Sequence, residues 1–323
     1  MIQVQRPVLS ICLPTNGIVE WVIPTLESIY AQNVDFSLFE VVITDNGEDS
    51  KLGEALKNYE YPNLIYIQTK DKGFLNLVTC LQKGNGLFNK MLNHRMMLKP
   101  GMLQKMIDVV NQYKDSKPVL YFLNGCLNLQ EFTVCKNLND FVSNMHFWVS
   151  WSAGIGFWDI DLPKLSQIEP NEMFPNTSLL FEHRIDSEYV IWNGSYGQMQ
   201  DESGKGGYDL FHTFGVVLND LIVELQQKGR ITSNVMKCFR RKLGLFLCNL
   251  YHNEVINAKN STHTFLVVNV KQSLLVYYGH IGYYLIIFCA WLSFIKNSVI
   301  RLIANTIQTK VAQMLCFISL LHY

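Results

Sequence analysis

Two short polar sequences, each following an apolar run, hold the residues with the clearest capacity for ligand chemistry. Pro14-Thr15-Asn16-Gly17 follows the run Val8–Leu13, and Asp45-Asn46-Gly47 follows Phe39–Thr44. Each run is rich in Ile, Leu and Val, which is typical of a buried parallel strand. Because the carboxyl ends of parallel strands meet at one edge of a sheet, these polar residues would form a ligand site there. The alternative is that both are ordinary turns, since Asn-Gly and Asp-Asn-Gly sequences form turns in any protein.

The elements that position these residues alternate between strand and helix. Val22, Leu26, Ile29 and Tyr30 recur at helical spacing between the two runs, and Pro24 fits only the first helical turn. Strand, helix and strand make a β-α-β unit with a right-handed crossover. Further strands are expected over residues 64–69, 87–92 and 119–124, and further helices over 102–113 and 137–149. The sequence therefore predicts an α/β fold with a mostly parallel central sheet flanked by helices.

The whole pattern resembles the family-2 glycosyltransferases of GT-A fold. In that family a turn like the one at Pro14–Gly17 is followed by a helix and by a strand that ends like Thr44–Gly47. The resemblance covers about the first 115 residues well and runs thinly to about residue 215. It implies a nucleotide-sugar donor, a GT-A-like domain over residues 1–215, and a helical C-terminal region over residues 216–323.

The resemblance also assigns residues to the donor site. Asp45 would accept a hydrogen bond from the nucleotide base, and Lys72 and Gly73 stand where the family has an element that lies against the nucleotide. The remaining residues implied to line the same pocket are Pro14, Thr15, Asn16, Glu20 and Asn46.

Asn93-His94-Arg95 occupies the position where the resembled family carries a D-x-D sequence that holds a divalent metal. Mg²⁺ and Mn²⁺ prefer oxygen ligands, so these three side chains cannot rebuild that site. A guanidinium can present a bidentate positive face to a phosphate, so Arg95, helped by His94, is a candidate replacement for the metal. The alternative is that Arg95 is a solvated residue of a decayed site. No divalent metal is expected at the usual position.

The literal D-x-D sequence, Asp159-Ile160-Asp161, lies about 65 residues too late for the family's metal motif. We predict a turn there, with Asp161 capping a short helix that begins at Leu162-Pro163. Metal binding by Asp159 and Asp161 is the alternative.

The family's general base belongs to an E-D pair, whose positions here hold Asn176 and Thr177. Neither side chain acts as a base at neutral pH. Glu182, His183 and Asp186 follow in the sequence FEHRID and are the candidate catalytic groups, together with Arg95. Alternatively, the FEHRID residues are exposed charges at a helix end, with Asp186 pairing with Arg184 or capping the helix.

Composition limits the classes of partner. The chain has 27 basic and 27 acidic residues and no basic arm, which argues against nucleic acid. The eight cysteines form no CxxC pair and the N-terminus shows no secretory leader, so we expect a reducing, cytoplasmic setting. Hydrophobic residues make up 49% and charged residues 17%, with the apolar excess near the C-terminus, which indicates a membrane surface as a partner.

The C-terminal third carries the membrane signal. Residues 235–256 form an amphipathic pattern with Lys237, Arg240, Arg241 and Lys242. Leu274–Ile295 holds no Lys, Arg, Asp or Glu, but its many tyrosines suit an interface better than the middle of a span. An in-plane or monotopic helix pair, continued by residues 298–321, is therefore predicted at the cytoplasmic face of the cell membrane. A true span and a dimer interface remain alternatives.

Gly204-Lys205-Gly206-Gly207 predicts a glycine-rich turn that opens a long helix through Leu225. A lid that binds an anion and a plain loop are the two interpretations of this turn.

Two functions follow from these observations. The first is an inverting glycosyltransferase that moves a sugar from a nucleotide-sugar donor to a lipid-linked or polysaccharide acceptor of a bacterial cell surface. The second is a catalytically silent GT-A-like protein that binds nucleotide or glycan and scaffolds a membrane assembly, which the loss of both acidic motifs favours.

Overall fold

The computed structural model describes residues 6–201 and 203–292, and it divides into two compact units. Of the described residues, the first unit comprises 6–201, Ser203 and Asp220–Phe239, and the second comprises Gly204–Asn219 and 240–292. The predicted continuation of the membrane helix over residues 298–321 lies outside the described residues. The predicted domain boundary after residue 215 remains a prediction.

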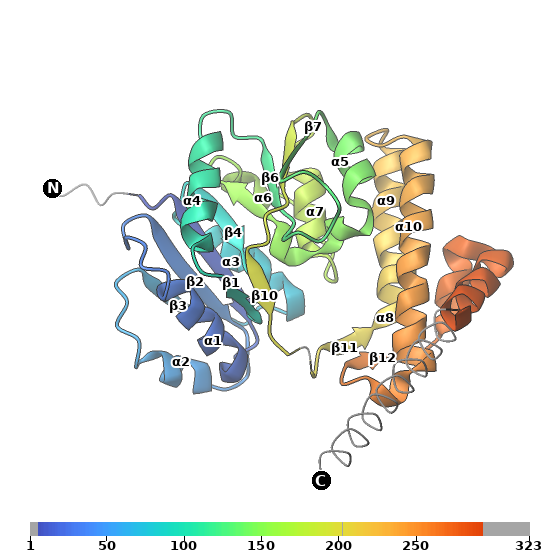
Figure 1. Ribbon diagram of the computed structural model, residues 1–323, viewed down its shortest axis with the longest axis horizontal. Helices are drawn as coiled ribbons and strands as arrows, with labels where there is room; N and C mark the ends of the chain where they lie inside the picture. The colour runs from blue at the N-terminus through green and yellow to red at the C-terminus, as the bar shows by residue number, and fades with distance from the viewer. Residues whose placement is uncertain (1–5, 202, 293–323) are drawn as a thin grey trace, which may run out of the picture. The chain divides into compact units, whose positions relative to one another are not determined.

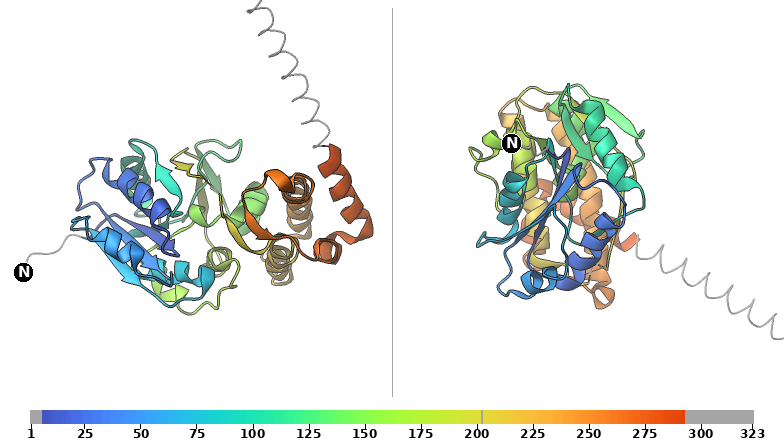
Figure 2. Two further views of the ribbon diagram at one scale, coloured as in Figure 1. Left: turned by 90° about the horizontal axis from the view of Figure 1, so that it is seen from below. Right: turned by 90° about the vertical axis from the view of Figure 1, so that its left-hand side faces the viewer.

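The first unit is built around a five-stranded sheet with the order β3-β2-β1-β4-β8. The first four strands are parallel, and β8 is antiparallel to β4 (Figure 1). The strands are β1 (Leu9–Thr15), β2 (Phe39–Asp45), β3 (Leu64–Gln68), β4 (Phe88–Met91) and β8 (Gly156–Trp158). In the right-hand view of Figure 2 these N-terminal strands run side by side with a twist. The predicted α/β class with a mostly parallel sheet is confirmed.

The strands are connected by helices that follow the apolar spacing of the sequence. Helix α1 (Val19–Tyr30) buries Val22, Leu26 and Ile29. Pro24 lies inside this helix and beyond its first turn, so the expectation that it occupies the first turn is wrong. Helix α3 packs on β1 and β2. The other helices of this part are α2 (Lys51–Leu56), α3 (Asn76–Lys83) and α4 (Met102–Tyr113).

A smaller sheet, of order β6-β9-β7, extends the first unit. Strand β6 pairs with β9 in parallel and β7 pairs with β9 in antiparallel orientation, and β5 and β10 form a separate two-stranded antiparallel sheet. These strands are β5 (Met96–Leu98), β6 (Val119–Phe122), β7 (Phe132–Cys135), β9 (Tyr189–Trp192) and β10 (Gly197–Met199). The helices between them are α5 (Leu138–Met145), α6 (Leu162–Leu165) and α7 (Pro175–Glu182).

The second unit combines a two-stranded parallel sheet, β11 (Gly206–Asp209) with β12 (Thr264–Leu266), and helical segments. The glycine-rich sequence therefore forms a strand before the helix, whereas the sequence interpretation placed a turn there. The helical segments are α8 (Leu210–His212), a π-helix (Thr213–Val217), α9 (Leu218–Gln227), α10 (Ser233–Tyr251), a second π-helix (His252–Ile256) and the apolar helix Val270–Leu292. Helices α9 and α10 each pass from one unit to the other.

Candidate functional site

The ends of β1, β2 and β4 form one edge of the main sheet, which we call the carboxyl edge. Asn76 holds the first two strands together there. Its side-chain amide donates to the carbonyl oxygens of Thr15 at 3.0 Å and Thr44 at 2.8 Å, and its amide oxygen accepts from the Thr69 hydroxyl at 3.1 Å. Because Asn76 is buried, these hydrogen bonds fix the spacing of the strand ends on which the predicted donor site depends.

Asp45 ends β2 at this edge and is fully buried. Its carboxylate accepts from the Tyr66 hydroxyl at 3.0 Å and from the Gly47 backbone N–H at 2.8 Å. The pKa of Tyr66 is raised to about 12, chiefly by burial and further by the hydrogen bond to Asp45. A nucleotide base that is to donate to Asp45 must therefore displace or share with Tyr66.

The other predicted donor-site residues surround Asp45. Thr15 is buried, Pro14 is half-buried, and Asn16 and Glu20 are exposed. The side-chain amide of Asn46 donates to the carbonyl oxygens of Asp71 at 2.9 Å and Gly73 at 3.0 Å. The structure thus brings the turn of residues 70–73, including Lys72 and Gly73, against the end of β2.

Arg95 lies just beyond the end of β4 and is buried, in contrast to the alternative of a solvated residue. Its guanidinium carbon lies 3.2 Å from the centre of the Trp21 ring, and its Nη1 donates to the Ser203 carbonyl at 3.2 Å. His94 lies beside it, with Nδ1 at 2.8 Å from the Thr15 hydroxyl. The pKa of His94 is lowered to about 4, chiefly by desolvation and further by the charge of Arg95, so its imidazole is neutral at pH 7.

The residues at the end of β4 do not fit a divalent metal. Asn93 Oδ1 accepts from the Arg95 backbone N–H at 2.9 Å, and the other two side chains offer an imidazole and a cation. Within residues 6–201 and 203–292, no group of three or more His, Cys, Asp or Glu side chains is placed to hold a metal ion. Hard cations need several oxygen ligands, which this donor set does not supply.

The positions of the family's E-D pair lie at the start of α7. The Asn176 amide donates to the Ser150 carbonyl at 3.0 Å, and the Thr177 hydroxyl donates to the Val149 carbonyl at 3.3 Å. Both side chains are buried and make structural hydrogen bonds. Ser150 lies five residues before Ile155, and the Ile155 carbonyl accepts from the N–H of Met91 at 3.1 Å. Because Met91 is the last residue of β4, the start of α7 lies on the carboxyl-edge side of this strand.

The other end of α7 points to the opposite, amino edge of the sheet. Arg184 makes a bidentate ion pair with Asp161, which lies beyond the end of β8 and hence beside the start of β4. Glu182 is exposed and pairs with Lys228 at 3.2 Å, and Asp186 is exposed. The structure therefore does not bring Glu182 and Asp186 together with Arg95.

His183 is buried at the same end of α7 and packs edge-to-face on Phe157. Its Nδ1 lies 2.9 Å from the Leu179 carbonyl, so this nitrogen carries a proton and donates. Burial lowers the pKa of His183 to about 4. A neutral imidazole enclosed in this way has a packing role in the structure, on the far side of the sheet from Arg95.

The literal D-x-D sequence also lies at the amino edge. Asp159 pairs with Arg6 at 2.6 Å and with Lys117 at 2.8 Å, and the ion pairs and the burial of Asp161 leave no metal-binding arrangement there. Asp161 precedes α6 as predicted, but its side chain makes no capping hydrogen bond because it pairs with Arg184. Arg184 is therefore not the partner of Asp186.

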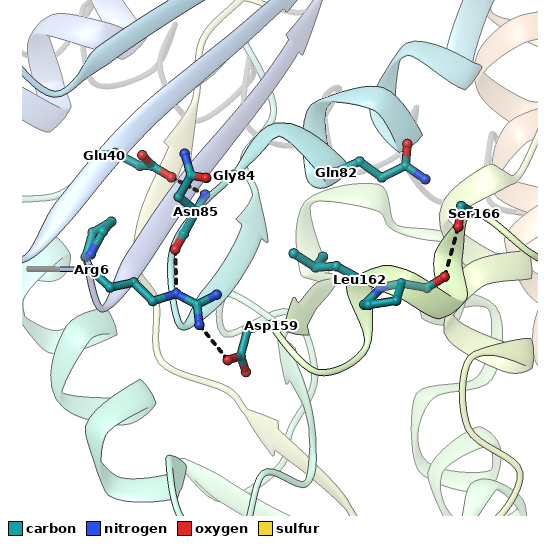
Figure 3. A pocket seen from close by; sticks show the side chains of 10 residues that line it. Arg6, Glu40, Gln82, Gly84, Asn85, Asp159, Leu162 and Ser166 are labelled. Carbon is teal, nitrogen blue, oxygen red and sulfur yellow. Dashed lines mark hydrogen bonds and ion pairs between the residues drawn. The ribbon is translucent and has the colours of Figure 1, made fainter. Parts of the chain in front are cut away.

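A cavity of about 810 Å³ opens at this amino edge. Figure 3 shows Arg6 on its rim, joined to Asp159, and the Glu40 carboxylate beside Asn85 and Gly84. None of the residues that the sequence assigned to donor or catalytic roles lines it. The cavity is thus separate from the carboxyl edge.

Three features of the carboxyl edge were missed by the sequence analysis. Trp21 supports Arg95, Tyr66 covers Asp45, and Glu172 pairs with Lys72 at 2.8 Å. The signal for Trp21 is a large aromatic residue next to Glu20 at the start of α1. Tyr66 lies 21 positions from Asp45 in the sequence, and Glu172 lies 100 positions from Lys72, so no local sequence pattern predicts these contacts.

Comparisons with known proteins identify structures that share this fold. No protein-family model matches the sequence, and no curated protein matches it. Among solved structures, S. aureus TarS in complex with UDP-GlcNAc matches with a TM-score of 0.56 and 15% identity, over 83% of this chain and 78% of that chain. The mannosyltransferase PcManGT from Pyrobaculum calidifontis, in complex with GDP-Man and Mn²⁺, matches with a TM-score of 0.54 and 13% identity, over 89% of this chain and 86% of that chain. The chain therefore has the GT-A-type fold of these glycosyltransferases.

Proposed function

We propose that this protein is a glycosyltransferase that binds a nucleotide-sugar donor at the carboxyl edge. The observation that carries the proposal is the placement of Asp45 and Arg95 at the ends of β2 and β4, the two strands that flank β1 in a GT-A-type sheet. Asp45 offers a carboxylate for a base, and Arg95 offers a positive charge for a diphosphate. The structural relatives bind UDP-GlcNAc and GDP-Man, which is consistent with a donor of this class.

In this proposal Arg95 takes over the electrostatic task that the resembled family gives to a metal. Trp21 covers one face of the guanidinium, and the Ser203 carbonyl accepts one of its N–H groups. The cation is therefore held in place before the donor binds, and it can stabilise the charge that develops on the leaving diphosphate.

The reaction would be an inverting displacement at the anomeric carbon of the donor sugar. An acceptor hydroxyl attacks from the face opposite the nucleoside diphosphate, loses its proton to a base, and the diphosphate departs. We place Glu172 in the role of base, because its contact with Lys72 brings a carboxylate beside the turn that approaches the end of β2. Glu182, His183 and Asp186 are weaker candidates because α7 carries them to the amino edge.

The acceptor is proposed to be a glycan or lipid-linked sugar at the cytoplasmic face of a membrane. The apolar helix Val270–Leu292 supports a membrane location, by length and composition. Its exposed apolar side chains from Ile281 onward form one stripe: Ile281, Tyr284, Leu285, Phe288, Trp291 and Leu292.

A break in this helix favours attachment within the plane of the membrane over a span. Gly279 has φ +60°, a left-handed conformation that interrupts a right-handed helix. The piece before the break, residues 270–278, is about 14 Å long at about 1.5 Å per residue. A hydrocarbon core is about 30 Å thick, so this piece does not cross it alone. Figure 2 shows this segment in orange to red.

A silent scaffold is the competing function, and one observation favours it. The side chains at the E-D positions, Asn176 and Thr177, are committed to backbone carbonyls and have no base chemistry. Calorimetric titration with UDP and GDP, followed by hydrolysis assays with UDP-sugars and GDP-sugars, separates the two functions. Nucleotide binding with turnover of any donor supports the transferase, and binding without turnover of every donor supports the scaffold. Absence of nucleotide binding contradicts the transferase and leaves only a scaffold that binds glycan.

A further inference from the structure

Two tryptophans stand on a short turn between α5 and β8, which we call the aromatic turn and define as residues 146–151. Trp148 and Trp151 are both partly exposed. Their rings meet edge to face, with centres 6.0 Å apart and planes at 87°. The turn lies close to the β5–β10 strand pair, because the Trp151 ring also lies 6.5 Å from that of Tyr196, whose carbonyl accepts from Lys99 N–H.

The aromatic turn is fixed from below by Tyr121 of β6. The Tyr121 hydroxyl lies 2.6 Å from the Trp148 carbonyl oxygen and 2.8 Å from that of Trp151. Gly154 makes this approach possible, since a Cβ there would lie 2.3 Å from the Tyr121 ring. The backbone that carries both tryptophans is therefore held at two points by one buried side chain.

A second clamp comes from α7. Asn176 and Thr177 donate to the carbonyls of Ser150 and Val149, the two residues between the tryptophans. The positions that the resembled family uses for its acid–base pair thus serve here to hold the aromatic turn.

Lys90 supplies the third clamp and links the turn to β4. Its ammonium donates to the Ala153 carbonyl at 2.6 Å and the Met91 carbonyl at 2.8 Å, and it lies 4.9 Å from the centres of the Phe122 and Tyr196 rings. Lys90 is fully buried and forms no ion pair in the described part of the chain. The end of β4, which leads into Asn93–Arg95, is therefore joined to the chain immediately after the aromatic turn.

We propose that Trp148 and Trp151 form the acceptor subsite and bind a sugar ring of a glycan. This inference rests on the proposed glycosyltransferase function and names its acceptor class. The C–H face of a pyranose is apolar and can pack on an indole ring, while its hydroxyls remain available to water and to polar neighbours. Because three clamps already order the turn, little conformational entropy is lost when a sugar binds.

A glycan fits this surface better than a lipid chain does. The turn carries His146 and Ser150 among its aromatic residues, and Ser152 follows it directly, so the tryptophans have polar groups on either side. The continuous aliphatic and aromatic stripe lies instead on the helix Val270–Leu292. The experiment must therefore distinguish glycan binding by the two tryptophans from lipid binding.

The experiment measures oligosaccharide binding to the full-length protein by calorimetry, with cellohexaose, chitohexaose and laminarihexaose as probes and UDP and GDP titrated in parallel. Trp148→Ala and Trp151→Ala should each weaken oligosaccharide binding at least about tenfold and leave nucleotide binding unchanged. Phe36→Ala is the matched control, since Phe36 is an exposed aromatic residue that precedes β2 at the amino edge. It should change neither affinity.

The outcomes distinguish this inference from the proposed function. The inference is overturned if wild-type protein binds nucleotide but none of the hexaoses, if both tryptophan variants bind hexaose normally, or if they lose vesicle binding instead. Hexaose binding that depends on the tryptophans without any nucleotide binding supports the glycan site and contradicts the transferase. Trp148→Phe and Trp151→Phe, which preserve packing, replace the alanine variants if circular dichroism shows unfolding.

Lys90→Met tests the clamp separately from the surface. It removes the ammonium that joins β4 to Ala153 while keeping an apolar side chain of similar length. Oligosaccharide affinity should fall at least about threefold with nucleotide affinity and the folded spectrum unchanged. Unchanged hexaose affinity in this variant would show that Lys90 does not position the turn.

Discussion

The guanidinium carbon of Arg95 lies over the Trp21 ring, 3.2 Å from its centre. Trp21 comes from the first turn of α1 and Arg95 from the segment after β4, so the pair links two elements that border the carboxyl edge. Stacking of this kind suits a planar cation and offers much less to a lysine ammonium. The arrangement orients the charge that the proposed reaction needs.

Arg95→Ala should lower kcat more than it weakens nucleotide-sugar binding, because the contact strengthens as the leaving diphosphate gains charge. Arg95→Lys should recover only part of the loss. Trp21→Leu should cost about 0.5–2 kcal/mol of the same stabilisation, which corresponds to a fall of about 2- to 30-fold in kcat/KM. Steady-state kinetics with saturating acceptor provide the measurement.

The same assay in the presence of EDTA tests the metal. Since no described residue at the end of β4 offers a carboxylate, transfer should proceed at an unchanged rate in chelator. Activity that is lost in EDTA and restored by Mn²⁺ would refute the assignment of Arg95 to this role.

Asp45→Ala should weaken nucleotide binding by about 1–3 kcal/mol, because it removes the proposed acceptor for the base. Tyr66→Phe should bind nucleotide at least as tightly as wild type, since it frees the carboxylate oxygen that the Tyr66 hydroxyl occupies at 3.0 Å. Isothermal titration with UDP and GDP measures both. Equal affinity of wild type and Asp45→Ala for every nucleotide that binds would move the base pocket elsewhere.

Two of the candidate carboxylates for the base, Glu172 and Glu182, can be compared directly. Glu172→Gln should lower kcat at least about 100-fold with little change in donor affinity, as expected for loss of general-base catalysis. Glu182→Gln serves as the control, because Glu182 is an exposed carboxylate on the same loop–helix segment and pairs with Lys228. A normal rate for Glu172→Gln together with a collapsed rate for Glu182→Gln would reverse the assignment.

Acid should destabilise the fold through His183. Its folded pKa of about 4 lies below its ordinary value of 6.5, so the unfolded chain binds more protons between these two values. The stability linked to His183 is complete above about pH 6.5 and is lost as the pH falls toward 4, by up to about 3 kcal/mol. Urea unfolding at several pH values measures this slope.

His183→Gln should flatten this acid slope, although it lowers stability at pH 7 through lost packing on Phe157. His94, whose pKa is also lowered to about 4, contributes a similar slope that remains in this variant. An identical pH dependence in wild type and His183→Gln would show that His183 does not titrate in this way.

Membrane association should depend on the apolar stripe of the helix Val270–Leu292. Replacing Ile281, Leu285 and Phe288 by Glu puts three charges on that stripe and should release the protein from sedimented lipid vesicles. Nucleotide binding should be retained. Val134→Glu is the control, since Val134 is equally exposed but belongs to the first unit. Vesicle binding that survives the triple replacement would place the anchor outside the stripe, and a loss of dimerisation instead would identify an interface between copies.

The strand–helix order of the first unit was predictable from sequence because each element carries its own signal. The apolar runs before Pro14 and Asp45 became β1 and β2, and the spacing of Val22, Leu26 and Ile29 became α1. The polar residues after these strands met at one edge because parallel pairing requires it. Those expectations depend on neighbours within a few residues.

The contacts that define the carboxyl edge depend on distant residues and could not be predicted in this way. Tyr66 of β3 donates to Asp45 of β2. Trp21, near the start of α1, contacts Arg95, which follows β4 much later in the sequence. The local sequence also does not show at which edge of the sheet the residues of FEHRID lie. The sequence places Asn176 and Glu182 on one short helix, but only the packing of α7 shows that its two ends face opposite edges of the sheet.

The hydrogen bonds of Asn76 affect which residues of such a site can be substituted during evolution. One buried amide sets the distance between the ends of β1 and β2, and it makes no use of the side chains at residues 93–95 or 176–177. The spacing of the strand ends thus depends on a buried side chain, and residues 93–95 and 176–177 lie on segments that take no part in these hydrogen bonds. A chain built in this way can exchange a metal-binding sequence for an arginine, or a catalytic pair for a structural one, without altering the gap into which a ligand must fit.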